Sequence, residues 1–111
     1  MPYKILIICQ YGASSCLLVN RMLKAADAQR VNVSVNACSE MMLEEEVVEA
    51  DIVLIAPQVR FMSKEIHSMC EDYSVPIMDI GPKDYGNMDG SKILEIAIDR
   101  VNQVNELTNS D

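Results

Sequence analysis

The chain has 111 residues, of which 50% are hydrophobic and 23% are charged, and its formal net charge at pH 7 is −8. This length is typical of one domain, covering residues 1–111, and the apolar runs are shorter than the roughly 20 residues that span a bilayer. The acidic excess opposes non-specific binding to nucleic acid, which depends on Lys and Arg contacts with phosphates.

Four runs rich in β-branched residues recur at nearly even spacing, and they predict four strands. The runs are Lys4 to Cys9, Val31 to Ala37, Asp51 to Ala56 and Val75 to Ile80. The first and third runs are almost continuously apolar, as in strands of a parallel sheet that helices cover on both faces.

The first two intervening stretches predict helices of different character. The first helix runs from Ser14 or Ser15 to Arg30, with apolar residues spaced to face the sheet. The second helix is shorter, begins after Ser39 as a good N-cap, and carries five glutamates between positions 40 and 49. A solvated helix face explains these glutamates more simply than an acidic docking surface does.

Two further helices are predicted, one after Pro57 and one near Gly90. The first of them has five large side chains at helical spacing on one side: Val59, Met62, Ile66, Met69 and Tyr73. The helix that begins near Gly90 covers the sheet, and the polar tail over residues 105–111 is expected to fray.

The alternation of strands and helices predicts an α/β fold with a four-stranded parallel sheet in the order 2-1-3-4 and helices on both faces. In such sheets, ligands bind beyond the carboxyl ends of the strands, where neighbouring connections leave for opposite faces. Cys9 ends the first strand, which flanks that point. We therefore expect the functional site at Cys9.

Residues 9–15, CQYGASS, have the composition of an anion-binding loop. Backbone N–H groups at a helix N-terminus lack partners, and the helix dipole favours negative charge there. Gly12 permits a tight turn, while Ser14 and Ser15 carry hydroxyls that bind phosphate oxygens or cap the helix. Because the same field stabilises a thiolate, Cys9 is a candidate nucleophile beside a phosphate-binding loop.

Simple core filling is the alternative explanation for each cysteine. It is the preferred one for Cys38 and Cys70, which no comparable loop surrounds, whereas Cys16 either packs or forms a disulfide with Cys9 under oxidation. The cysteines have neither metal-ligand spacing nor the density of a disulfide scaffold, and no secretory signal is recognisable. We expect reduced cysteines in a cytoplasmic protein with no metal site and no cofactor.

A cysteine within a phosphate loop is also found in low-molecular-weight tyrosine phosphatases, where five residues separate it from an arginine. Ser15 stands where that arginine would be. Without a bidentate guanidinium to stabilise the phosphoryl transition state, efficient hydrolysis is not expected, and the same gap argues against an arsenate reductase. The loop suits holding a phosphoryl group better than hydrolysing it.

Three motifs resemble the IIB components of the bacterial phosphotransferase system, specifically the lactose/cellobiose class. They are Cys9-x-x-Gly12-x-Ser14-Ser15-x-Leu17-Leu18-Val19, Ala56-Pro57-Gln58-Val59 and Tyr85-Gly86-x-x-Asp89-Gly90. The likeness spans nearly the whole chain, and the stand-alone length of the chain is typical of the cellobiose and chitobiose members. Two features depart from the class: Cys16, where a hydroxyl residue is common, and Gly81-Pro82-Lys83 before the last motif.

The resemblance implies a low-molecular-weight tyrosine phosphatase-like fold and a two-step relay. A IIA protein passes a phosphoryl group from its phosphohistidine to Cys9, and the phosphocysteine passes it to cellobiose or a related β-glucoside bound by the membrane-embedded IIC permease. The implied phosphate-binding residues are Gln10, Tyr11, Gly12, Ala13, Ser14 and Ser15. The resemblance further implies no membrane insertion of the chain itself, and a carrier that meets two partners in turn is expected to be a monomer.

Pro57 and Gln58 follow another strand and are possible border residues of the site, although the start of a helix explains them equally well. His67 falls on the polar side of its predicted helix, so a surface position suits it better than a role as phosphoryl acceptor. Two other functions stay open. A cysteine-dependent phosphatase or arsenate reductase would turn over its substrate, and a non-enzymatic binding module would tolerate Cys9→Ser.

Overall fold

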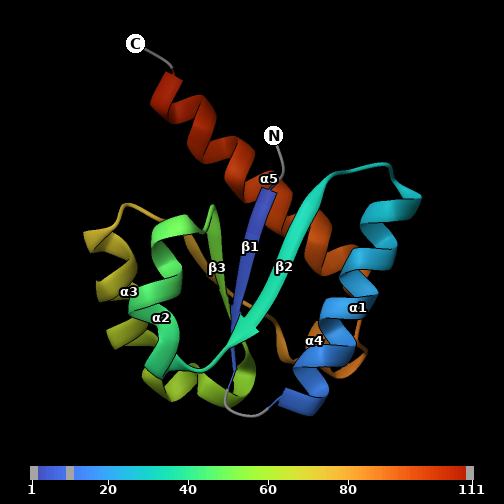
Figure 1. Ribbon diagram of the computed structural model, residues 1–111, viewed down its shortest axis with the longest axis horizontal. Coiled ribbons are helices and arrows are strands. Elements are labelled where there is room, and N and C mark those ends of the chain that lie inside the picture. The colour runs from blue at the N-terminus through green and yellow to red at the C-terminus, as the bar shows by residue number, and fades with distance from the viewer. Residues whose placement is uncertain (1–2, 10–11, 110–111) are drawn as a thin grey trace.

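Four parallel strands form the centre of the protein (Figure 1). The computed structural model describes residues 3–9 and 12–109, and only the backbone for residues 12–16 and 106–109. The strands are β1 (Tyr3–Ile8), β2 (Val33–Cys38), β3 (Ile52–Ile55) and β4 (Ile77–Asp79). They form one sheet in the order β2-β1-β3-β4, which confirms the predicted topology.

Helices cover both faces of this sheet (Figure 1). On one face lie α1 (Gly12–Ala28) and α5 (Gly90–Asn109), which contact each other. On the other lie α2 (Leu43–Glu46) and α3 (Ser63–Asp72). The shorter elements are η1 (Glu40–Met42), η2 (Val47–Glu49), η3 (Pro57–Met62) and α4 (Pro82–Gly86). None of the helices in the described residues has both the length and the apolar character of a membrane span.

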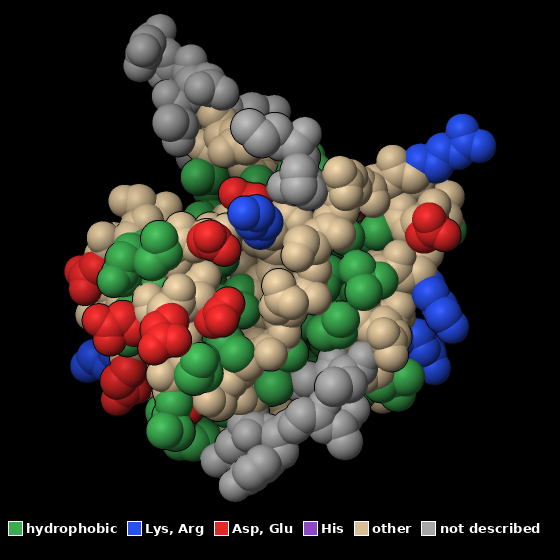
Figure 2. Space-filling model, in the orientation of Figure 1, with side chains coloured by type: hydrophobic (Ala, Val, Ile, Leu, Met, Phe, Trp, Pro, Cys, Tyr) green, Lys and Arg blue, Asp and Glu red, His purple; other side chains and the backbone are tan. Residues whose placement is uncertain are grey.

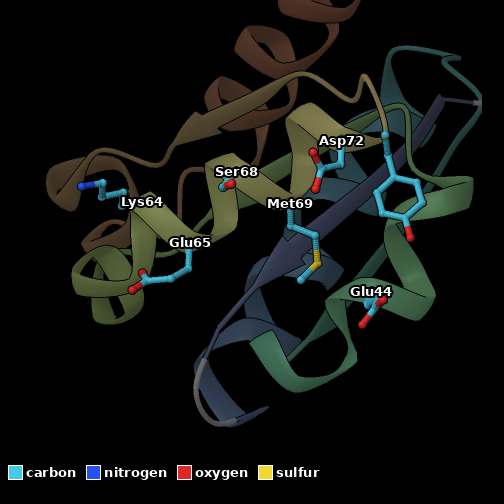
Figure 3. A pocket seen from close by; sticks show the side chains of 7 residues that line it. Glu44, Lys64, Glu65, Ser68, Met69 and Asp72 are labelled. Atoms are coloured by element: carbon cyan, nitrogen blue, oxygen red, sulfur yellow. The ribbon is translucent and has the colours of Figure 1, made fainter.

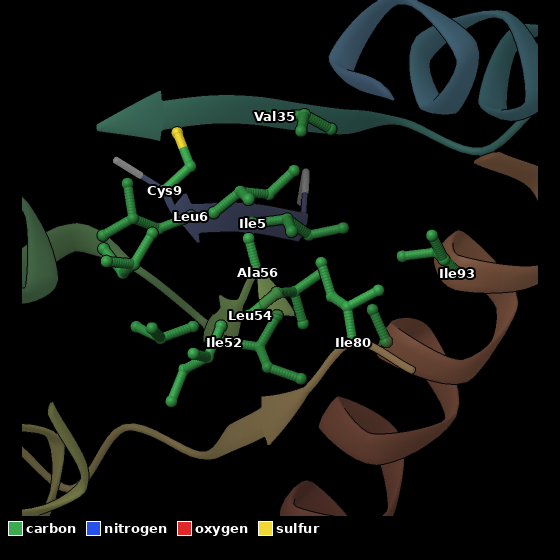
Figure 4. Packing of buried hydrophobic residues seen from close by; sticks show 14 of the residues in the cluster. Ile5, Leu6, Cys9, Val35, Ile52, Leu54, Ala56, Ile80 and Ile93 are labelled. Carbon is green, nitrogen blue, oxygen red and sulfur yellow. The ribbon is translucent and has the colours of Figure 1, made fainter. Parts of the chain in front are cut away.

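The two central strands are the most deeply buried elements, as their continuous apolar sequences predict. Every residue of β3 and the last four of β1 are at most 4% exposed (Figure 4). Leu18 and Met22 of α1 and Ile93 and Leu94 of α5 cover one face of these strands with fully buried side chains. The sheet is therefore sandwiched between two apolar helix layers, as expected for a parallel sheet.

The helix α1 differs from its predicted bounds at both ends. It begins at Gly12, two residues before Ser14, and ends at Ala28 rather than Arg30. Arg30 has a left-handed φ of 57°, and the Val31 N–H donates to the Ala26 carbonyl at 2.9 Å. This arrangement is a C-terminal capping motif, and it stops the helix without a glycine.

The predicted second helix is replaced by three short pieces, η1, α2 and η2. Ser39 occupies the N-cap position of η1, but its side chain makes no capping hydrogen bond. The segment places glutamates at neighbouring positions and two β-branched valines, Val47 and Val48, in succession. Like charges three or four residues apart and stiff side chains both weaken an α-helix, which accounts for the breaks.

The segment after Pro57 begins as the irregular turn η3, with non-helical dihedral angles at Val59, before α3 starts at Ser63. Val59 and Ile66 are buried as predicted, but Tyr73 lies beyond the end of α3 and is 42% exposed. Cys70 takes the buried position instead. The prediction was wrong for Tyr73 because α3 ends at Asp72, so the next residue no longer follows the helical spacing.

Two features near the C-terminus were not expected from the sequence. The helix α4 forms after Gly81 with Pro82 in its first turn, a position where proline is favourable. In addition, α5 continues to Asn109, past the predicted fraying point at residue 105. Propagation of an existing helix adds one hydrogen bond per residue, so a polar sequence can extend it.

Asp89 caps the N-terminus of α5. Its Oδ1 accepts a hydrogen bond from the Lys92 N–H at 3.1 Å, and the Lys92 Nζ lies 3.1 Å from an Asp84 oxygen. Because an N-cap contributes about 1 kcal/mol, we expect Asp89→Ala to lower the free energy of unfolding in urea by about that amount. Asp99→Ala removes the same charge from exposed mid-helix and should have a much smaller effect. Equal losses in the two variants would contradict the capping role.

Candidate functional site

Cys9 lies at the carboxyl edge of the sheet, one residue beyond β1 (Figure 4). Its N–H donates to the Cys38 carbonyl at 2.9 Å, so the β1–β2 ladder continues through it. On the other side, Ile8 pairs with Ile55 of β3. Cys9 is thus held at the end of a central strand, and it is only 5% exposed. This is the position at which parallel α/β sheets bind ligands.

The N-terminus of α1 follows Cys9 closely, because the helix begins at Gly12. The first N–H groups of an α-helix have no partner within the helix, and among the described residues these are the N–H groups of residues 12–14. Together with the positive end of the helix dipole they form an anion-binding surface. Gln10 and Tyr11 lie outside the described residues, and the side chains of Ser14 and Ser15 are not described. The phosphate-binding role of residues 10–15 stays a prediction.

Pro57 and Gln58 lie at the same edge as Cys9. The Ala56 N–H donates to the Ile8 carbonyl at 3.0 Å, and Ala56 is the N-cap of η3, whose first residue is Pro57. Pro57 is half-buried and Gln58 is exposed. Both residues follow the strand next to β1 and Pro57 begins a helical turn, while their role at the border of the site stays a prediction.

The segment from Tyr85 to Gly90 contacts α1 through Gly90. Tyr85 is 6% exposed, and Gly90 is buried against the backbone of α1. A Cβ atom built on Gly90 would lie 2.5 Å from the Arg21 carbonyl carbon and 2.7 Å from the Met22 nitrogen. Only glycine permits this approach, so the third sequence motif has a structural role in holding the helix whose N-terminus adjoins Cys9.

Two other cysteines are poor nucleophiles in this structure. Burial, with a further contribution from the Glu46 charge and then from Cys9, raises the pKa of the Cys38 thiol from 9.0 to about 11. Burial alone raises the pKa of Cys70 to about 11, and Cys70 is completely covered. Since the thiolate is the reactive form, both thiols are inert at neutral pH.

We expect iodoacetamide labelling of Cys38 in the native protein to have its midpoint near pH 11. A raised thiol pKa means that the thiolate forms only above the pH at which an unfolded cysteine ionises, so labelling at pH 9 is slow in the native state and fast in urea. Peptide mapping of labelled samples across a pH series measures this. A native midpoint at or below pH 9 would contradict the assignment.

Residues 4–96 match the family model described as the lactose/cellobiose-specific IIB subunit of the phosphotransferase system, PTS. The chain belongs to this IIB family. A curated relative, the oligo-beta-mannoside-specific EIIB component of the PTS from Bacillus subtilis, is 34% identical over 86% of this chain and 92% of that protein.

Solved IIB structures share the fold. The cellobiose-specific IIB protein from Borrelia burgdorferi superposes with a TM-score of 0.81 and 37% identity, covering 93% of this chain and 94% of that one. The lactose-specific IIB domain from Streptococcus pneumoniae also gives 0.81, at 22% identity, over 90% of this chain and 98% of that one. PTS IIB components are sugar phosphotransferases that work with IIA and IIC partners, so this chain is a phosphotransferase component of sugar transport.

Proposed function

We propose that Cys9 is the phosphoryl carrier of this IIB protein. In the first step its thiolate attacks the phosphorus of a phosphohistidine on IIA; the N–P bond breaks, an S–P bond forms, and the histidine is released. The observation that carries the proposal is the position of Cys9 at the end of β1, three residues before the start of α1. The free N–H groups there stabilise the negative charge of the phosphoryl oxygens.

In the second step the phosphoryl group passes to a sugar held by the IIC permease. The S–P bond breaks and its electron pair returns to the Cys9 sulfur, an O–P bond forms to a sugar hydroxyl, and the hydroxyl proton passes to water. The relatives are named for oligo-beta-mannoside, cellobiose, lactose and galactose, and the first three are β-linked saccharides. We assign cellobiose or a related β-glucoside as the sugar. Both steps depend on in-line positioning and charge stabilisation, which need no cofactor.

The phosphatase alternative is disfavoured by position 15. Serine stands there in place of the arginine that would stabilise the transition state for hydrolysis. The protein therefore retains the phosphoryl group until a partner docks, and we infer that it acts as a single-domain, monomeric carrier in the cytoplasm.

Intact-protein mass spectrometry tests the first step. The protein is incubated with phosphoenolpyruvate, the two general PTS proteins and a cellobiose-type IIA, and we expect one added phosphoryl group that peptide mapping places on Cys9. No added mass, with IIA shown to be phosphorylated, would overturn the proposal for that IIA class. Assays with aryl phosphate and arsenate would then test the alternative.

A further inference from the structure

Large apolar side chains are exposed at the edge of the sheet that carries Cys9. Met41 and Phe61 are 82% and 73% exposed, and Met42 is 42% exposed. Met41 and Met42 belong to η1, which follows β2, while Phe61 belongs to η3, which follows β3. Both connections leave the carboxyl edge of the sheet, on either side of the strand that ends at Cys9. These side chains are exposed in the isolated chain, which is typical of a surface that a partner covers.

A groove runs between α2 and α3, the helices that directly follow η1 and η3 in the chain. Its volume is about 870 Å³, and α2 contributes Glu44 while α3 contributes Lys64, Glu65, Met69 and Asp72. Figure 3 shows the Met69 side chain directed into the space between the α3 ribbon and the α2 segment that carries Glu44. The groove thus combines an apolar side chain with three carboxylates and one ammonium group.

The surroundings of the groove are also acidic. The three glutamates of α2, at positions 44, 45 and 46, are all exposed. Figure 2 shows acidic and hydrophobic side chains intermixed over this part of the surface. We call the surface formed by η1, α2, η3 and α3 the α2/α3 face. A solvated helix would explain the glutamates alone, but it does not explain why Met41 and Phe61 are exposed among them.

We propose that the α2/α3 face docks on the Lys- and Arg-bearing cytoplasmic loops of the membrane-embedded IIC partner. This inference rests on the proposed function. Cytoplasmic loops of membrane proteins carry an excess of Lys and Arg, which complements the carboxylates of this face. The inner leaflet is itself anionic and repels a chain of net charge −8, so attraction to the membrane surface has to come from the permease. The apolar edge beside Cys9 then packs against the permease near the sugar.

The test separates phosphoryl acceptance from phosphoryl delivery. Acceptance is the rate of Cys9 phosphorylation by IIA in solution. Delivery is the transfer of the phosphoryl group from phosphorylated Cys9 to sugar on inside-out membrane vesicles that contain the cognate IIC. Vesicles of the same lipids without the permease serve as the reference. The charge variant is Glu44→Lys with Glu65→Lys, and the apolar variant is Met41→Ser with Phe61→Ser.

Matched controls exist on other surfaces of the chain. Glu95→Lys with Asp99→Lys makes the same charge change on exposed positions of α5, on the opposite face of the sheet. Val48→Ser removes an apolar side chain that is 62% exposed. Val48 belongs to η2, which precedes β3 and therefore lies toward the other end of the sheet. All of these positions are on the surface, so the variants should fold.

Both α2/α3-face variants should raise the half-saturating vesicle concentration for delivery about tenfold, in the range of interfacial charge pairs. Acceptance should stay within about twofold of the parent. Added salt should reduce the difference between the parent and the charge variant, because it screens exposed charges. The two control variants should behave as the parent does in both assays.

Three results would overturn the inference. The first is unchanged delivery in both face variants. The second is an equal loss of delivery in the α5 control, which would mean that only net charge matters. The third is a fall in acceptance as large as the fall in delivery, which would assign the face to IIA. Failure of the parent to become phosphorylated at all is a different result. It would refute the carrier role of Cys9, and this inference with it.

Discussion

The Cys9→Ser variant should accept no detectable phosphoryl group from IIA, with acceptance falling at least about a thousandfold. Serine is almost the same size as cysteine and keeps the backbone hydrogen bond to Cys38, so the edge of the sheet stays intact. A hydroxyl, however, is a much weaker nucleophile than a cysteine sulfur. The measurement is the added phosphoryl mass after a fixed time with charged IIA.

Two controls make this result specific. Because Cys9 is buried, a serine hydroxyl there can cost stability, and Cys9→Ala supplies a second variant without a polar group. The thermal unfolding of both shows whether they fold. Cys38→Ser and Cys70→Ser remove the other described thiols and should leave acceptance unchanged. Full phosphorylation of folded Cys9→Ser, or its loss in Cys38→Ser alone, would assign the carrier elsewhere.

The Gly90→Ala variant should lose about 2–3 kcal/mol of unfolding free energy, as overpacked sites do. The added methyl group would lie 2.5–2.7 Å from backbone and Cβ atoms of Arg21 and Met22, which cannot move aside as a flexible side-chain end can. The helices α1 and α5 must therefore separate. The better helix propensity of alanine offsets only part of this cost, about 1 kcal/mol at most. Urea unfolding monitored by circular dichroism measures the change.

Gly86→Ala is the matched control for this prediction. Gly86 belongs to the same sequence motif and is exposed, and nothing lies within 4 Å of a Cβ atom built on it. Its φ is not positive, so alanine introduces no backbone strain. We expect its stability to lie within about 0.5 kcal/mol of the parent, as for most surface substitutions. Similar losses in both variants would show that the contact between Gly90 and α1 is not the cause.

The same contact links stability to phosphoryl transfer. Gly90 packs on α1 at Arg21 and Met22, about two turns after the helix N-terminus beside Cys9. If α1 shifts away from the sheet in Gly90→Ala, its free N–H groups shift relative to the thiol. We expect acceptance at Cys9 to slow in the folded fraction of this variant while Gly86→Ala is unaffected. Small displacements of positioned groups slow transfer strongly.

The sheet topology and the position of Cys9 at the carboxyl edge could be predicted from the sequence. The apolar runs of β1 and β3 are typical of strands that are buried on both faces, and right-handed connections then leave few strand orders. A cysteine directly after the first of these strands, followed by a small-residue loop, falls at the carboxyl edge in any such fold. Local pattern and chain connectivity suffice for these features, because each depends on neighbours in sequence or on general handedness rules.

The arrangement of the remaining segments depends on tertiary contacts and could not be predicted from the sequence. The break of the second helix into η1, α2 and η2, the kink at Val59 and the exposure of Tyr73 depend on which side chains find room against the sheet. The residues next to Gly90 in the sequence do not show why glycine is needed there. The need arises from contact with the backbone of α1, about 70 residues earlier in the chain. The same holds for the α2/α3 face, where residues from two separate connections meet. Periodicity describes one element at a time, whereas these features are contacts between elements, which only packing specifies.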